Sequence, residues 1–121
     1  MRILIFLFFI FGILLGNDSF LSNDEYARML FKNPRGIACS ECHGERGEGG
    51  ILTAYTIQKD GKKILKEIKA PRINTLDMKS FIKAFEKKKR YMPRYYLTDK
   101  ELAYIYYYLL KQREKHEDQK K

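Results

Sequence analysis

The chain has 121 residues, with 24 lysine and arginine side chains against 15 acidic ones and a formal net charge of +9. This length fits a single domain, and nine tyrosines with eight phenylalanines exclude a disordered chain. The basic balance is compatible with nucleic acid, an anionic membrane or an acidic protein partner, and by itself selects none of them.

The first 16 residues have the pattern of an export signal. Arg2 precedes an apolar run from Ile3 to Leu15, and the chain turns polar at Asn17. This run is shorter than the roughly 20 residues that a membrane-spanning helix needs. We predict a signal peptide over residues 1–16 and a periplasmic location, whereas an uncleaved signal would leave the protein anchored to the membrane.

We predict one helix in the N-terminal part of the chain and another in the C-terminal part. Ser22 and Glu25 form a capping box, apolar residues follow at helical spacing, and Pro34 ends the segment. A second box, Thr98 with Glu101, opens the strongest amphipathic pattern in the chain, which runs to residue 110. Apart from His116, residues 111–121 carry only charged or amide side chains, and we predict that this tail frays into solvent.

The segment between these helices is less regular. The pair Asp60-Gly61 is a strong tight-turn signal, so residues 51–70 are predicted to form an irregular loop or a small hairpin. Asn74, Thr75 or Asp77 can cap a short helix that carries Phe81 and ends in a run of basic residues.

Both cysteines lie in one Cys-x-x-Cys-His motif, Cys39 to His43, for which four interpretations exist. A disulfide would close a very small loop and contribute little stability. A thioredoxin-like pair needs a βαβ frame, and a zinc site needs a fourth ligand, for which the only remaining histidine is His116 in the tail. The favoured interpretation is attachment of a c-type haem, in which both thiols form thioethers and the histidine binds iron. Export agrees with it.

A haem iron in an electron carrier needs a second axial ligand. Met29 lies on a predicted core face and Met78 at the start of the short helix, where packing explains each. Met92 stands before a proline in the loop between two helices, where it can turn inward. It is therefore the favoured ligand, with a gap-filling role in the core as the alternative.

Together these features resemble a class I c-type cytochrome over most of residues 22–111. The resemblance implies an all-α, cytochrome c-like fold for residues 17–110, in which the first and last helices pack beside one covalent haem. It also implies thioethers at Cys39 and Cys42 and axial iron ligands at His43 and Met92. Tyr26 or Leu30 would then meet residues of the last helix: Ile105, Tyr106 or Leu109.

One feature of that family is not transferred. Its members often orient the haem histidine through a proline carbonyl that follows the motif. Pro71 is the only proline between His43 and Met92, but it follows the atypical segment 51–70. We therefore assign it no such role at this point.

The function that the resemblance implies is single-electron transfer in a respiratory chain by a monomeric, non-enzymatic protein. If Met92 does not bind iron, the alternative is a five-coordinate haem module that binds ligands or acts like a peroxidase. An obligate haem subunit of a larger complex is a third, lower-ranked interpretation.

Five cations near Met92 suggest a docking surface: Lys87, Lys88, Lys89, Arg90 and Arg94. They are interpreted either as a solvated face or as the site that meets an acidic oxidase, reductase or peroxidase. Nucleic acid is not expected for an exported protein, and a weak association with a membrane surface stays open.

Overall fold

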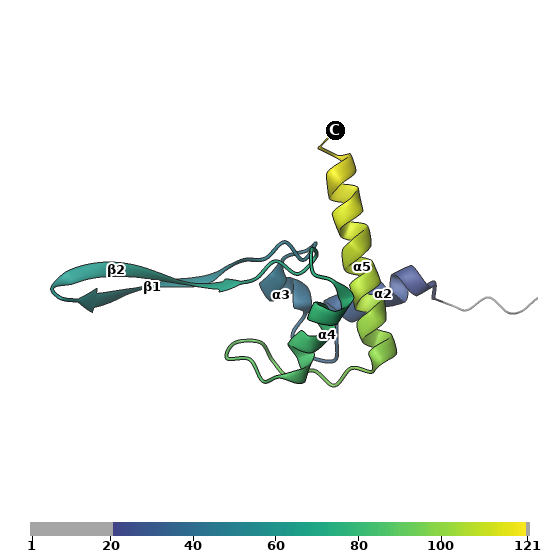
Figure 1. Cartoon of the computed structure of the whole chain (residues 1–121), viewed down its shortest axis with the longest axis horizontal. Coiled ribbons are helices and arrows are strands. Elements are labelled where there is room, and N and C mark those ends of the chain that lie inside the picture. The colour runs from purple at the N-terminus through teal and green to yellow at the C-terminus, as the bar shows by residue number, and fades with distance from the viewer. Residues whose placement is uncertain (1–20, 121) are drawn as a thin grey trace, which may run out of the picture.

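A computed structural model describes residues 21–120 of the chain. The predicted signal peptide therefore lies outside the described residues. The elements in chain order are α2 (Asn23–Lys32), α3 (Cys39–His43), β1 (Gly50–Lys59), β2 (Lys62–Ala70), α4 (Met78–Glu86) and α5 (Asp99–Asp118). Figure 1 shows the helices gathered into one body, from which the β1–β2 hairpin extends to one side. No helix within residues 21–120 has the length and apolar character to cross a membrane.

Both predicted capping boxes are confirmed. At the start of α2, the Ser22 hydroxyl accepts a hydrogen bond from the Glu25 backbone N–H, and the Glu25 carboxylate accepts from the Ser22 N–H. Thr98 and Glu101 form the same reciprocal pair at the start of α5. Each pair satisfies backbone donors that a helix N-terminus otherwise leaves without partners.

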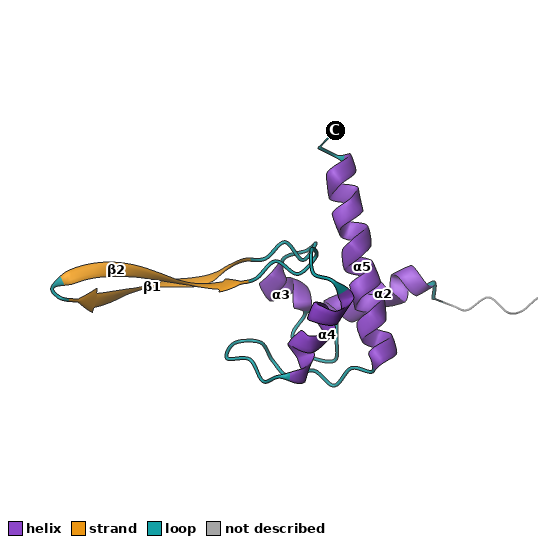
Figure 2. Ribbon diagram, viewed as in Figure 1, coloured by secondary structure: helices purple, strands orange, loops and turns teal. Residues whose placement is uncertain are grey.

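The core forms where α2 crosses α5, as Figure 2 shows. Leu30 and Phe31 of α2 are buried with Ile105 and Leu109 of α5. The expected contact between the first and last helices is confirmed. The buried stripe of α2 differs from the prediction, however, because Met29 is 45% exposed whereas Phe31 is fully buried.

Helix α4 is capped by Asp77, whose carboxylate accepts a hydrogen bond from the Ser80 backbone N–H. Of the three predicted caps, Asp77 is thus the one that the structure uses. The helix places Phe81 in the core, where its ring lies 5.6 Å from that of Tyr106.

The C-terminal tail differs from the prediction. Helix α5 continues through the charged segment to Asp118 rather than fraying after Lys111. Lysine, glutamine, arginine and glutamate are good helix formers, and the spacing of Arg113 and Glu117 allows an attractive i, i+4 pair. The apolar stripe therefore marks where the buried part of this helix ends, but the helix itself continues beyond it.

Residues 50–70 form an antiparallel hairpin, so the fold is not purely α-helical, unlike the all-α prediction. Asp60 and Gly61 both have positive φ angles, 53° and 73°, as a two-residue type I′ turn requires. A register shift between Ile51 and Thr53 marks a bulge near the hairpin's base. Of the two structures predicted for this segment, the hairpin is the one observed.

Candidate functional site

The Cys-x-x-Cys-His motif coincides with α3, a helix of one short turn. Both cysteines are unpaired thiols, with Cys39 7% exposed and Cys42 half-buried. Burial raises the pKa of the Cys39 thiol to about 11, because a thiolate would lose its hydration there. One helical turn thus brings two thiols and one imidazole to the same place.

The His43 ring is oriented by Pro71, whose carbonyl oxygen lies 2.8 Å from the ring Nδ1. A carbonyl can only accept, so Nδ1 carries the proton and donates it. In the neutral imidazole with this proton on Nδ1, the lone pair of Nε2 on the other side of the ring is available to a metal. Sequence reasoning did not assign this role to Pro71, and the structure provides the contact.

The hairpin explains how Pro71 reaches His43. Gly50 pairs with Ala70, so the chain leaves and returns at the same point. The 21 residues from 50 to 70 therefore add almost nothing to the distance between the motif and Pro71. The signal for this was present in the Asp60-Gly61 turn, which fixes the two arms of the hairpin against each other.

Hydrogen bonds join the loop after His43 to the loop after Pro71. The backbone N–H of Ile73 donates to the Gly47 carbonyl at 2.8 Å across the two loops, and within the first loop the N–H of Gly49 donates to the His43 carbonyl at 2.7 Å. The side chain of Asn74 is only 3% exposed and donates to the Arg46 carbonyl at 2.9 Å. These bonds hold the segment that contains Pro71 next to His43.

Gly49 is required at this junction. Its φ is +80°, and a Cβ atom there would lie 2.8 Å from the Ala70 carbonyl oxygen and 2.8 Å from the Arg72 nitrogen. Only a residue without a side chain permits so close an approach between the two backbone segments. The glycine-rich stretch after the motif thus brings the hairpin base against the histidine loop.

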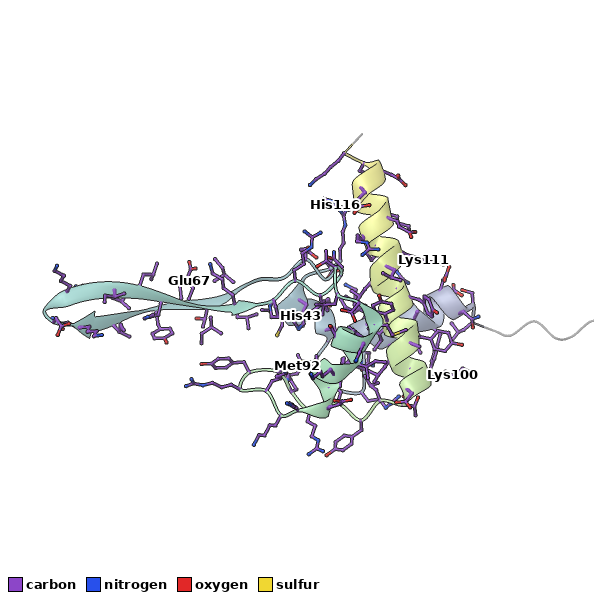
Figure 3. The ribbon with its side chains drawn as sticks, viewed as in Figure 1. His43, Glu67, Met92, Lys100, Lys111 and His116 are labelled. Atoms are coloured by element: carbon purple, nitrogen blue, oxygen red, sulfur yellow. The ribbon has the colours of Figure 1, made fainter. Side chains whose placement is uncertain are left out.

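A cavity of about 380 Å³ opens beside α3. Its wall is formed by residues from every described element except α2: Ala38, Cys39, Cys42, His43, Leu52, Lys69, Ala70, Pro71, Arg72, Ile73, Leu76, Phe81, Ala84, Phe85, Lys89, Arg90, Tyr91, Met92, Pro93, Tyr95 and Ile105. Figure 3 shows His43 on α3 and Met92 on the loop that follows α4. The structure therefore brings together all four predicted site residues.

The other candidate ligands lie elsewhere. Met29 and Met78 do not line this cavity, and His116 lies far along α5, as Figure 3 shows. Among residues 21–120, no group of three or more histidine, cysteine or acidic side chains is arranged to hold a metal ion. The described strands form only an antiparallel hairpin, which is not the frame of a thioredoxin-like pair.

The chemistry of the wall fits a haem. Most lining side chains are apolar or aromatic, which suits a flat porphyrin, and two thiols and an imidazole stand at one edge. Four cations also line the cavity and no lining residue is acidic, which suits the two carboxylates that a haem carries: Lys69, Arg72, Lys89 and Arg90.

Tyr95 closes part of the wall and links it to the segment before the motif. Its hydroxyl donates to the Ile37 carbonyl at 2.8 Å, and its ring lies against Gly36. Burial, with the nearby cysteines, raises the pKa of Tyr95 to about 12, so the phenol stays protonated and keeps donating. Sequence reasoning did not single out this residue.

Fold and site together define a protein with a single Cys-x-x-Cys-His motif beside a largely apolar cavity that fits a haem. The family model described as "Cytochrome c" matches residues 25–113, and the chain belongs to that family as a class I c-type cytochrome. Its cofactor is accordingly a covalent c-type haem with its iron, and the family consists of haem-based electron carriers. Comparison with curated proteins and with solved structures finds no match.

Proposed function

We propose that the protein is a single-electron carrier whose haem is attached at Cys39 and Cys42 and ligated by His43 and Met92. The observation that carries this proposal is that all four side chains line one largely apolar cavity. Bound haem supplies an iron that alternates between the ferric and ferrous states. Binding of the iron by both His43 and Met92 would leave no position open for a substrate, which argues against an enzyme.

The surrounding residues support this role. The Pro71 carbonyl accepts a hydrogen bond from the Nδ1–H of His43 and thereby raises the electron density at Nε2. Apolar side chains such as Phe81 and Ile105 line the cavity, where they would exclude water from a bound haem and lower the local dielectric constant. Thioether ligation by methionine favours the reduced iron and raises the potential relative to two nitrogen ligands.

Substitution of Met92 tests the ligand set in the purified holoprotein. The oxidised wild type should show the weak near-infrared methionine–iron band, and its reduced form should not bind carbon monoxide. Met92→Ala should lose the band, bind carbon monoxide and have a lower potential. Met78→Ala is the matched control and should retain all wild-type properties, because Met78 does not line the cavity. Rapid carbon monoxide binding by the wild type would instead indicate the five-coordinate haem module.

The proposed partner is an acidic redox protein such as an oxidase, reductase or peroxidase. Lys89 and Arg90 line the cavity, and the neighbouring cations Lys87, Lys88 and Arg94 are exposed. Cations around the cavity mouth would steer an acidic surface toward the haem edge. The proposed location is the periplasm, reached through the signal in residues 1–16.

A further inference from the structure

The β1–β2 hairpin is much longer than its role at His43 requires. Only its base reaches the cavity, and Figure 1 shows the rest extending away from the helices. Nearly every residue of both strands is exposed, and α3 is the only other described element with a substantial contact to them. An isolated two-stranded hairpin is at best marginally stable in water. This ribbon therefore lacks a covering surface within the described chain.

The register sorts the ribbon's side chains into two faces, because directly opposed residues share a face. Thr53 pairs with Ile68, Tyr55 with Lys66, and Ile57 with Ile64. One face thus carries a continuous apolar stripe, here called the apolar ribbon face: Tyr55, Ile57, Ile64 and Ile68. Tyr55 is 47% exposed and Ile64 is 38% exposed.

The charges on this face all have one sign. Lys59, Lys62 and Lys66 share it, and none of them forms an ion pair within residues 21–120. Lys59 and Lys62 are directly opposed, an arrangement that is unfavourable without a counter-charge. The acidic residue Glu67, labelled in Figure 3, belongs to the opposite face, where its carboxylate pairs with Lys69 at 2.8 Å.

These charges select among the surfaces that could cover the stripe. Two copies of the ribbon stacked face to face would bring lysines against lysines with no acid between them. A bilayer is a poor match, because the end of the ribbon is Lys59-Asp60-Gly61-Lys62, with no apolar side chain to insert. An acidic protein surface with an apolar centre complements both the stripe and its lysines.

The base of the ribbon lies at the cavity. Leu52 of β1 and Lys69 and Ala70 of β2 are part of the cavity wall, together with Lys89 and Arg90. A protein seated along the ribbon would therefore lie beside the cavity mouth. We propose that the apolar ribbon face and its three lysines form a docking arm for the acidic redox partner; this rests on the proposed function.

Photo-crosslinking in the protein's own cells provides the test, with a benzophenone amino acid as the probe. The probe is placed at Ile64 on the apolar ribbon face, or at Leu65, which is 64% exposed on the opposite face. The two positions are adjacent in one strand, so they differ in face and little else. We expect adducts from Ile64 to one redox protein with an acidic surface, and few or none from Leu65.

The crosslinked protein is then purified and its electron-transfer rate with the holoprotein is measured. Lys66→Glu on the apolar ribbon face should slow transfer about tenfold at 0.15 M salt, where the Debye length is about 8 Å. Lys63→Glu, opposite Gln58 on the other face, should change it by less than about twofold. Both variants keep the cross-strand apolar pair Ile57–Ile64 that supports the hairpin.

Several results would overturn the docking arm. They are adducts between two copies, adducts to lipid, equal labelling from both faces, no adduct at all, or equal rates for the two charge variants. Failure of the proposed function has a different signature, since it appears as carbon monoxide binding to the reduced wild-type holoprotein. If the wild-type spectra are those of a carrier but Lys66→Glu and Lys63→Glu transfer electrons at equal rates, the docking arm alone is refuted.

Discussion

The Nδ1 atom of His43 and the carbonyl oxygen of Pro71 lie 2.8 Å apart, although 28 residues separate them in the chain. Most of the intervening residues belong to a hairpin that begins at Gly50 and returns at Ala70. The orientation of the histidine ring therefore depends on how tightly the two ends of the hairpin are held together. Two residues at the junction, Gly49 and Asn74, make this dependence measurable.

Gly49→Ala should destabilise the protein by about 1–3 kcal/mol, because the new Cβ meets the Ala70 carbonyl oxygen at φ +80°. Denaturant unfolding followed by far-ultraviolet circular dichroism measures the loss. Gly50→Ala is the neighbouring control: a Cβ there has no atom within 4 Å, and we expect a change within about 0.5 kcal/mol. Equal losses in the two variants would contradict a special close approach at Gly49.

Asn74→Ala should cost about 1–3 kcal/mol of unfolding free energy, because it leaves the Arg46 carbonyl without its buried donor. The same truncation at Asn33, which is exposed after α2, should cost less than about 0.5 kcal/mol. Unfolding curves of both variants against the wild type provide the comparison. An Asn74→Ala variant as stable as Asn33→Ala would show that the two loops are held by other contacts.

The sequence was sufficient for the parts of this fold that depend on local chemistry. Reciprocal bonds within four residues define the caps at Ser22 and Thr98, and both were predicted correctly. Pro71 was not, because its partner is brought close by strand pairing between distant residues rather than by neighbours in the chain. The length of α5 was missed for a related reason: the apolar pattern marks where the helix is buried, whereas the propensity of its charged residues carries it to Asp118.

The predicted site residues also differ in how the sequence defined them. Cys39, Cys42 and His43 lie within one helical turn, so their proximity follows from their spacing alone. Met92 reaches the same cavity only because α4 and its following loop form part of the cavity wall, a placement that no local pattern contains. Tyr95 was missed since one tyrosine among nine has no distinguishing sequence context.

An ion pair between Arg35 and Glu101 should make stability depend on acid pH. The guanidinium donates to the carboxylate at 2.7 Å and is the main cause that lowers the pKa of Glu101 from 4.5 to about 2, with the Thr98 backbone N–H adding to it. Because the folded pKa is depressed, this stabilisation is fully present above pH 4.5 and is lost as the pH falls toward 2.

Glu101→Gln tests this linkage. The variant should be less stable than the wild type at pH 7, and the difference should narrow between pH 4.5 and 2, as unfolding midpoints would record. Arg35→Gln should show the same narrowing, since it removes the same ion pair from the other side. A difference that stays constant across this range would mean that Glu101 acts only as a helix cap.

The cations after α4 should control the encounter with an acidic partner without altering the iron. Lys87→Glu with Lys88→Glu reverses two charges on the segment that continues into the cavity wall at Lys89 and Arg90. We expect the second-order electron-transfer rate at low salt to fall by about tenfold or more and to approach the wild-type rate at high salt. The redox potential should hardly change, because both side chains are exposed and neither lines the cavity.

The matched control carries the same charge change far from the cavity. Lys115→Glu with Lys120→Glu alters the distal end of α5, which Figure 1 shows on the far side of the helical body from the α4 loop. Because net charge falls equally in both double variants, any rate difference between them reports position rather than total charge. Stopped-flow measurements at two salt concentrations compare the two double variants. If the control slows transfer as much as the Lys87 and Lys88 variant does, the effect comes from net charge and not from the position of these cations.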